Sequence, residues 1–371
     1  MPMKPKEESL EQLRREIDAV DAELIDLINR RAETVVKVGK IKRASGIPIY
    51  APHRESEVLA KIQRLNKGPI SNRTIEAVYR ELMSGSFALE QPLRIGYLGP
   101  VGTYSHLAAT KHFGSSVEFE NLRAINGVFE EVARGHVDYG LVPIENSTGG
   151  GITETLDAFL TYHGRLNIYG EVQLAVHFSL LANCKPQDVK RIYSKAEAFS
   201  QCRNWLSTQY PQVELIPAES TAMAVRRAKA ELDEDPNSGV SAIGSSLAGE
   251  IYGLHALFEQ IEDHQTNITR FLILSKAETE MSNDDKTSIM FTTEDRPGSL
   301  VDVLNVFKRN SVNLTHIDKR PSREVNWDYT FFVDAIGHRK DTKFAEILGE
   351  ARAHCKNLTV LGSFPRCKRS L

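Results

Sequence analysis

Two basic residues bracket two valines on one stripe of a long predicted helix near the start of the chain. Arg31 and Lys42 are 11 residues apart, with Val35 and Val38 between them. In a helix this spacing places the two cations about 20° apart around the axis and about 16 Å apart along it. A buried cation is costly unless an anionic group meets it. The pattern therefore predicts either a partner carboxylate or a small dianionic ligand.

The helix that carries these residues is predicted from about Glu7 to Ala44, because the segment lacks proline and its apolar residues recur at intervals of three and four. A lone arginine on such a seam is often only an ion-paired structural residue. Two shorter helices follow, one opening near Arg54 and one from Ser71 to Glu90. A helix of about 57 Å cannot bury its own seam in a monomer of this size. We therefore expect an intertwined all-α dimer.

Residues 7 to 91 resemble the all-helical chorismate mutase family, in the segments Leu13–Asp18 and Val38–Lys42, in Arg31 and in Arg54-Glu55. The resemblance implies that the carboxylates of chorismate are held by cations, and that the ring hydroxyl and the ether oxygen are held by polar side chains. The implied carboxylate ligands are Arg31, Arg54 and, from the partner subunit, Arg14, whereas Lys42 donates to the ether oxygen, Glu55 holds the hydroxyl and Ser86 lines the site. Such a rearrangement needs a clamp and donors rather than a nucleophile.

Two positions depart from this family. Ala51 stands where an Asp is common, and Glu90 stands where many members have a Gln facing the ether oxygen. An ionised carboxylate would repel the developing oxyanion, so we expect Glu90 to act only when protonated. Mutase activity is then expected to fall as pH rises. The alternative is that Glu90 is a solvated residue at a helix end.

Composition limits the remaining functions. The chain has 371 residues, is 41% hydrophobic and carries a net charge of −3, which fits a globular protein of two or three domains. No basic stripe indicates nucleic-acid binding, and no apolar run is long enough to span a membrane. The four cysteines lack zinc-ligand spacing and close pairs, which favours a reducing cytoplasm. We expect no metal and no cofactor.

Residues 92–276 alternate between predicted strands and amphipathic helices, which indicates a mainly parallel α/β domain with room for two lobes and a cleft. The glycine-rich turn Gly96–Gly102 lacks the spacing of a dinucleotide fingerprint. Polar loops follow two predicted strands and precede a third, and together the three loops favour a site for a small oxygen-rich anion. These loops contain Thr103, Glu145–Ser147 and Thr269-Arg270.

This middle region resembles prephenate dehydratase over residues 93 to 275, in Gly99–Ser105, Pro143–Ser147, Tyr193-Ser194, Gln201-Cys202, Glu219–Thr221 and Thr269–Phe271. The resemblance implies that Thr269 is catalytic and that Arg270 anchors a carboxylate. It makes Asn146, Ser194 and Gln201 polar residues of the site. A neutral hydroxyl can help the ring hydroxyl depart as carbon dioxide and water are lost. Lys195 stands where a His is expected.

Residues 277–371 predict a β-α-β-β-α-β order, which is ferredoxin-like. Pro297–Leu300, Arg320-Pro321 and Trp327–Tyr329 resemble the ACT regulatory domain. The resemblance implies that L-phenylalanine binds at a subunit interface through Gly298, Ser299, Leu300, Asp318, Arg320 and Pro321. The loop differs from the family's Glu-Ser-Arg-Pro, because this chain has Asp318–Pro321 in its place. A purely structural domain is the alternative.

Together these patterns predict three domains, at residues 1–91, 92–276 and 277–371, and a bifunctional enzyme. It would convert chorismate to prephenate and prephenate to phenylpyruvate, with feedback inhibition by L-phenylalanine. One alternative is a dehydratase whose helical domain only dimerises, against which Arg31, Lys42 and Arg54 argue. Another is a non-catalytic two-lobed sensor of amino acids or carboxylates, against which Thr269 argues. A fusion to a dehydrogenase would need the missing dinucleotide fingerprint.

Overall fold

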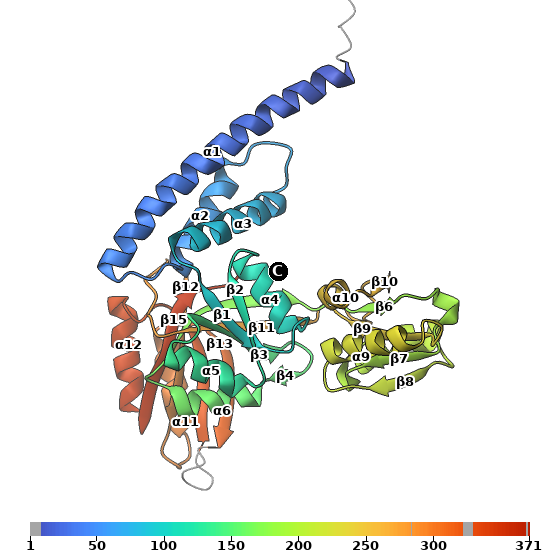
Figure 1. Cartoon of the computed structure of the whole chain (residues 1–371). Coiled ribbons are helices and arrows are strands. Elements are labelled where there is room, and N and C mark those ends of the chain that lie inside the picture. The colour runs from blue at the N-terminus through green and yellow to red at the C-terminus, as the bar shows by residue number, and fades with distance from the viewer. Residues whose placement is uncertain (1–8, 283, 322–328, 369) are drawn as a thin grey trace, which may run out of the picture.

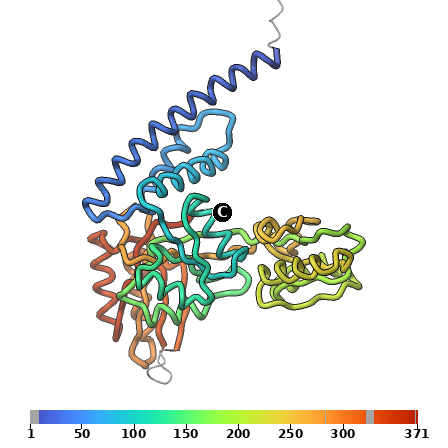
Figure 2. Tube along the Cα trace, in the orientation of Figure 1, coloured from blue at the N-terminus to red at the C-terminus, as the bar shows by residue number. Residues whose placement is uncertain are grey.

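The computed structural model describes residues 9–282, 284–321, 329–368 and 370–371. Three parts follow one another along the chain: a helical part, a two-lobed α/β part and a C-terminal α+β part (Figure 1). The helical part stands on the first α/β lobe, which also contacts the C-terminal part. The second lobe extends to the side (Figure 2). No helix in the described ranges is both long and apolar enough to cross a bilayer.

The N-terminal part consists of three helices, as predicted. They are α1 (Leu10–Ser45), α2 (Pro52–Leu65) and α3 (Asn72–Glu90). Serine hydroxyls cap two of them, since Ser9 accepts a hydrogen bond from the Gln12 amide and Ser71 accepts one from the Thr74 amide. Gly46 ends α1 with a φ of 66°, a conformation that glycine adopts without strain.

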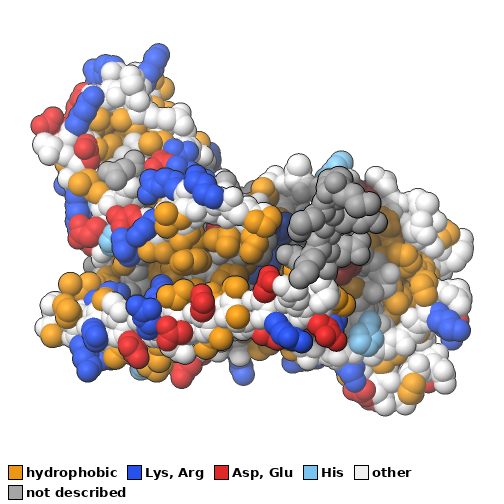
Figure 3. All heavy atoms as spheres, turned by 90° about the horizontal axis from the view of Figure 1, so that it is seen from above, with side chains coloured by type: hydrophobic (Ala, Val, Ile, Leu, Met, Phe, Trp, Pro, Cys, Tyr) orange, Lys and Arg blue, Asp and Glu red, His pale blue; other side chains and the backbone are white. Residues whose placement is uncertain are grey.

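Along α1 the predicted apolar seam is exposed to solvent in the single chain. Its residues are 38–64% exposed, although they are spaced as a helix-packing face. The seam consists of Leu10, Leu13, Ile17, Val20, Leu24 and Leu27. Figure 3, which looks down on this end of the molecule, shows hydrophobic side chains gathered at the surface.

The first α/β lobe is built on a mixed sheet of order β2-β1-β3-β11-β5, with β4 paired to β3. Its strands are β1 (Arg94–Leu98), β2 (Glu118–Leu122), β3 (Tyr139–Asn146), β4 (Gly150–Gly151), β5 (Asn167–Ala175) and β11 (Ile268–Ser275). Its helices are α4 (Tyr104–Phe113), α5 (Ile125–Arg134) and α6 (Thr153–Tyr162).

The second lobe has a five-stranded sheet of order β10-β6-β9-β7-β8. Its strands are β6 (Ser179–Ala182), β7 (Arg191–Ser194), β8 (Glu214–Pro217), β9 (Val240–Gly244) and β10 (His255–Phe258). Its helices are α7 (Ala196–Gln201), α8 (Arg203–Gln209), α9 (Thr221–Glu234) and α10 (Ser246–Tyr252), with a 3₁₀ turn at Pro186–Asp188.

The prediction of a mainly parallel sheet is wrong, because both sheets are mixed. In the first lobe β1 is parallel to β2 and β3, but β11 is antiparallel to both β3 and β5. The apolar run Ile168–Leu181 is not one strand either, since it divides into β5 of the first lobe and β6 of the second. The chain leaves the first lobe after β5 and returns as β11, and this return strand runs opposite to its neighbours.

The C-terminal part has the predicted β-α-β-β-α-β order and a sheet of order β13-β14-β12-β15, which is the ferredoxin-like arrangement. Its elements are β12 (Asp285–Thr292), α11 (Ser299–Arg309), β13 (Leu314–Pro321), β14 (Tyr329–Ile336), α12 (Thr342–Ala353) and β15 (Asn357–Pro365). Trp327 and Asp328, which belong to the expected ACT motif, lie outside the described residues.

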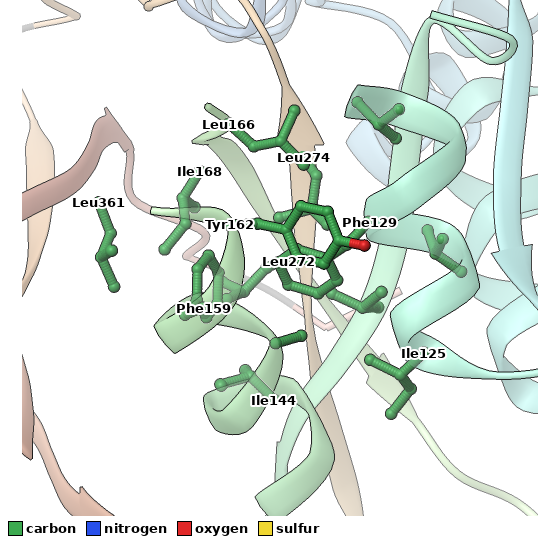
Figure 4. Packing of buried hydrophobic residues seen from close by; sticks show 14 of the residues in the cluster. Ile125, Phe129, Ile144, Phe159, Tyr162, Leu166, Ile168, Leu272, Leu274 and Leu361 are labelled. Atoms are coloured by element: carbon green, nitrogen blue, oxygen red, sulfur yellow. The ribbon is translucent and has the colours of Figure 1, made fainter. Parts of the chain in front are cut away.

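The C-terminal sheet shares a hydrophobic core with the first lobe. Phe129 packs edge-on against Phe159 with ring centroids 5.0 Å apart, and Leu361 of β15 faces the same cluster (Figure 4). Strand β15 also crosses β5 closely at Gly362, where a side chain would collide with the Ile168 backbone. The two parts are therefore packed as one body rather than joined only by a linker.

Candidate active sites

The predicted mutase residues of α1 and α3 meet within one chain. Arg31 Nη1 donates a hydrogen bond of 2.9 Å to the hydroxyl oxygen of Ser86, which itself donates to the Leu82 carbonyl at 2.7 Å. Ser86 is buried, so its hydroxyl orients the guanidinium from a fixed position. The arginine of the apolar seam therefore faces α3 and retains donors for a ligand.

One helical turn beyond Val38, the ammonium of Lys42 lies 3.2 Å from the Glu90 carboxylate and donates to the Ile49 carbonyl at 2.7 Å. Glu90 is only 5% exposed, so it is not the solvated helix end that was the alternative. Gly39 makes this approach possible, because a side chain there would overlap the Glu90 side chain. Lys42 and Glu90 thus form a partly buried ion pair, about 16 Å along α1 from Arg31.

Arg14 and Arg54 are not gathered into this cluster in the single chain. Arg14 is exposed on α1, and Arg54 is exposed and paired with Glu57 at 2.7 Å. Arg14 was expected to act in a partner subunit, which its exposure allows. Arg54 would have to leave Glu57 to bind a carboxylate.

Glu55 lies against the first α/β lobe, where its carboxylate is 3.8 Å from His112 Nε2 on α4. The same imidazole nitrogen is 2.7 Å from the Tyr50 hydroxyl. Burial raises the pKa of Glu55 to about 6 and lowers the pKa of His112 to about 3. This placement puts Glu55 at the contact between the two domains, which the expected hydroxyl-binding role did not anticipate.

At the dehydratase site, Asn146 and Thr269 lie directly opposite each other on β3 and β11. Asn146 Nδ2 donates a hydrogen bond of 2.8 Å to the Thr269 hydroxyl and another of 2.7 Å to Asn267 Oδ1. Its own amide oxygen accepts bonds from the Thr148 hydroxyl and the Gly149 amide. These contacts fix the amide and hence the hydroxyl beside it.

Gln201, which ends α7 in the second lobe, reaches this cluster across the cleft. Its amide nitrogen donates to the Thr148 hydroxyl at 3.0 Å, and its amide oxygen accepts from Asn267 at 2.6 Å. Three of the predicted residues, Asn146, Gln201 and Thr269, are therefore brought together. Neutral hydrogen-bonding groups join the two lobes at this point, which suits a hydroxyl that must leave with a proton.

Two residues of this cluster had no predicted role. Asn267 is only 3% exposed and links Asn146 to Gln201, while Thr148 links the same pair from the other side. Thr148 directly follows the predicted loop Glu145–Ser147, and Asn267 stands two residues before Thr269. This closeness in sequence to predicted site residues was the available signal.

Ser194 does not join the cluster in this structure. Its hydroxyl is fully buried and donates to the Ile243 carbonyl on the neighbouring strand β9 at 2.9 Å. Lys195 caps the start of α7 and pairs with Glu197 at 3.2 Å. The hydrogen bond of Ser194 supports the sheet rather than the cleft.

Arg270 does not face the cleft, so its expected role as carboxylate anchor needs correction. Its guanidinium donates to Glu171 at 2.7 Å and to Asp334 at 2.5 Å, and it is 5% exposed. Consecutive residues of a strand point to opposite faces, so Arg270 and Thr269 cannot both face the substrate. Its charge is already balanced by two carboxylates at the contact with the C-terminal part.

The C-terminal part has an open pocket of about 210 Å³ at the start of α11, lined by Gly298, Ser299, Leu300, Tyr329 and Phe331 among others. The buried Ser299 hydroxyl has no hydrogen-bond partner among the described residues. Gly298 has a φ of 86°, which turns the chain into the helix. Half of the predicted allosteric residues therefore line one cavity.

The other predicted allosteric residues lie elsewhere on β13. Arg320 makes two hydrogen bonds, of 2.7 and 3.0 Å, to Asp157 on α6. The Asp318 carboxylate lies so close to Gly151 that a side chain there would collide with it. Pro321 ends β13 and pairs with Tyr329. Within one chain Asp318 and Arg320 therefore contact the first lobe, whereas Pro321 pairs with a residue that lines the pocket.

Comparison with known proteins gives three family matches in chain order. The family models for chorismate mutase type II, prephenate dehydratase and the ACT domain match residues 13–91, 95–279 and 287–353. The prephenate dehydratase of Arthrobacter aurescens, solved in complex with L-Phe, superposes with a TM-score of 0.68 at 33% identity, covering 75% of this chain and 92% of that one. The prephenate dehydratase of Staphylococcus aureus gives 0.63 at 30% identity, covering 73% and 100%.

Relatives of matching length carry both catalytic domains. The bifunctional chorismate mutase/prephenate dehydratase of Stutzerimonas stutzeri is 43% identical over 97% of this chain and 98% of its own length. That of Aquifex aeolicus is 39% identical over the same shares of both chains. With all three domains matched in order and relatives aligned over nearly their whole length, the chain belongs to the family of bifunctional chorismate mutase/prephenate dehydratases.

Proposed function

We propose that the helical domain rearranges chorismate to prephenate through Arg31, Lys42, Ser86 and Glu90. Arg31 binds a carboxylate of the substrate and Lys42 donates to the ether oxygen as the carbon–oxygen bond breaks. The reaction is a concerted rearrangement, so these groups act by holding the reactive conformer and by stabilising charge on the oxygen. Glu90 pairs with the Lys42 ammonium and would donate to that oxygen only in its protonated form. Arg54 joins the carboxylate site when it releases Glu57.

The cleft between the α/β lobes dehydrates and decarboxylates prephenate to phenylpyruvate. Thr269 donates a hydrogen bond or a proton to the departing ring hydroxyl as the carboxylate is lost as carbon dioxide. Asn146 holds the Thr269 oxygen, and Gln201 with Asn267 closes the cluster from the second lobe. This assignment is supported by the hydrogen bonds that join residues of both lobes at one point.

The C-terminal domain binds L-phenylalanine as a feedback inhibitor at the pocket of Gly298, Ser299 and Leu300. The unpartnered, buried Ser299 hydroxyl supports a polar ligand there. Asp318 and Arg320 complete the site only from another subunit, since within one chain they contact the first lobe. Pro321 pairs with the pocket residue Tyr329 of the same chain. Isothermal titration with L-phenylalanine tests the pocket of Gly298, Ser299 and Leu300, and absence of heat would refute it.

The substrates are small charged acids, and we place both reactions in the cytoplasm.

A second copy of the chain covers the exposed seam of α1 and brings its Arg14 into the mutase site. The support is the spacing of six apolar residues that the single chain leaves uncovered. Sedimentation equilibrium is expected to give a homodimer or a larger homo-oligomer. A monomer at micromolar concentration would contradict this assembly.

The observation that carries the whole proposal is the presence of two separate clusters in one chain, Arg31 with Lys42 in the helices and Asn146 with Thr269 in the cleft. The test supplies chorismate alone to the purified protein and follows prephenate and phenylpyruvate over time. Phenylpyruvate appearing after prephenate supports both sites. Prephenate accumulating without phenylpyruvate rejects the cleft assignment, and no turnover favours a non-catalytic sensor.

A further inference from the structure

Two neighbouring residue pairs on β3 and β11 face opposite sides of the same sheet. Thr269 lies opposite Asn146, and the next pair along is Arg270 opposite Glu145. Side chains alternate between the faces of a strand, and one residue advances it by only about 3.3 Å. The first pair faces the cleft, so the second pair faces the C-terminal domain. Each member of the catalytic pair is covalently joined to a residue that contacts another domain.

Arg270 is held in a buried cluster of four charges that spans both domains. Glu171 of β5 and Asp334 of β14 accept from its guanidinium, and Lys286 of β12 donates to Glu171 at 2.9 Å. The four residues are between 4% and 7% exposed. Two cations thus face two carboxylates, with one of each on either side of the domain contact.

The remaining acceptors of this cluster are also occupied. The second oxygen of Glu171 accepts from the Cys367 amide at 2.9 Å, and Asp334 accepts from the Ser288 hydroxyl. Burial alone would raise the pKa of Asp334, but Arg270 and Lys286 outweigh it and hold that pKa below its usual range. A buried charge cluster with every carboxylate bonded has one preferred geometry, because losing any partner leaves an uncompensated charge.

Glu145 makes a second bridge to the C-terminal domain. Its carboxylate lies 2.5 Å from His316 Nδ1 on β13, and this hydrogen bond lowers the pKa of Glu145. His316 and Asp334 are themselves neighbours across β13 and β14. The two bridges therefore join one spot on the C-terminal sheet to one spot on the catalytic sheet.

We propose that Arg270 and Glu145 are positioning residues, through which the C-terminal sheet sets the places of Thr269 and Asn146 for dehydration. This inference rests on the proposed role of Thr269. A shift of β14 moves Asp334, which pulls on Arg270 of β11 beside Thr269. A shift of β13 moves His316, which pulls on Glu145 of β3 beside Asn146. Binding energy at the regulatory domain can reach the cleft by this route.

The test compares Asp334→Asn with Asp284→Asn in the full-length protein. Asp284 is a matched control, because it is also a carboxylate of the C-terminal domain and pairs with Arg366 at 3.1 Å, away from β11. Asp334→Asn is expected to lower dehydratase kcat between about 10- and 100-fold, the scale of a small misplacement of a catalytic group. The KM for prephenate and the mutase rate are expected to change less than about threefold, and Asp284→Asn to leave all three unchanged.

A double variant separates positioning from general weakening of the fold. If Asp334 acts through Thr269, then Asp334→Asn lowers kcat in the wild-type background and has no further effect beside Thr269→Val. Additive losses, or an unchanged kcat in Asp334→Asn, would overturn the inference. If Thr269→Val alone retains a near-normal rate, the proposed function fails instead, so the two failures are distinguishable.

His316→Gln provides a second test should Asp334→Asn not fold. It removes the bridge to Glu145 at a less buried position and leaves the four-charge cluster intact. We expect the same fall in dehydratase kcat with an unchanged mutase rate. A folded His316→Gln protein with wild-type dehydratase kinetics would reject the role of Glu145.

Discussion

The amide of Asn146 donates a hydrogen bond of 2.8 Å to the hydroxyl oxygen of Thr269. An oxygen that accepts from an amide can still donate its own proton, and among the described residues no acceptor for that proton is present. The Thr269 hydroxyl can therefore donate its proton to a bound ligand while Asn146 holds its oxygen. This is what a reaction needs when a ring hydroxyl has to leave as water.

Replacing the hydroxyl of Thr269 is expected to separate the two activities. Thr269→Val keeps the shape of the side chain but removes the donor, so dehydratase kcat should fall by about 100-fold or more. Thr269→Ser keeps a hydroxyl and should retain far more activity. Steady-state assays with prephenate measure the difference. Similar rates for the Val and Ser variants would show that the hydroxyl takes no part in the reaction.

The Glu90 carboxylate is expected to limit mutase activity. At 3.2 Å from Lys42, it neutralises the donor and repels the developing negative charge on the ether oxygen. Glu90→Gln replaces the carboxylate with an amide that can donate to that oxygen, so kcat/KM for chorismate should rise. Steady-state assays of the variant and the wild type measure the difference. The hypothesis is lost if both proteins give the same kcat/KM.

The raised pKa of Glu55 is expected to affect stability in a defined pH window. The folded pKa is about 6 and the ordinary value is 4.5, so the folded state binds the proton more tightly. The destabilisation of the folded state is therefore absent below pH 4.5, grows as the pH rises from 4.5 to about 6, and is complete above that. It amounts to about 2 kcal/mol when complete. Neutral His112 offers no compensating positive charge in this range.

Urea unfolding of Glu55→Gln tests this effect against the wild type at about pH 4.5 and about pH 7.5. The variant should gain stability relative to the wild type at the higher pH. Glu57→Gln is the matched control, since Glu57 is on the same helix but exposed. A pH-independent difference between Glu55→Gln and the wild type would show that the carboxylate is not held protonated by burial.

Local signals in the sequence predicted the helices and the C-terminal domain well. Ser71 caps α3 and Gly46 ends α1, and both signals depend only on neighbouring residues. The mixed sheets were not predictable in this way. Strand β11 inserts between β3 and β5, which lie more than 90 residues earlier in the chain, and nothing in its own residues determines the direction of its neighbours.

The same contrast between local signals and long-range contacts applies to the site residues. Arg31 and Lys42 were placed together by helical spacing, and Asn146 and Thr269 by resemblance. Arg270 was expected to face the substrate, although strand alternation already places its side chain on the other face of β11 from Thr269. Its partner Asp334 is in another domain, so only the folded structure could reveal where its charge is balanced.

Complementation between two variants tests most directly whether the chain carries two independent active sites. Arg31→Ala removes a carboxylate ligand of the mutase and Thr269→Val removes the dehydratase donor, while Arg30→Ala, an exposed neighbour paired with Asp26, serves as the control. Each variant is given chorismate alone, and then the two are mixed. We expect phenylpyruvate from the mixture and from Arg30→Ala, but almost none from Arg31→Ala or Thr269→Val by itself. Efficient formation of phenylpyruvate by Arg31→Ala or by Thr269→Val alone would contradict the assignment of the two sites.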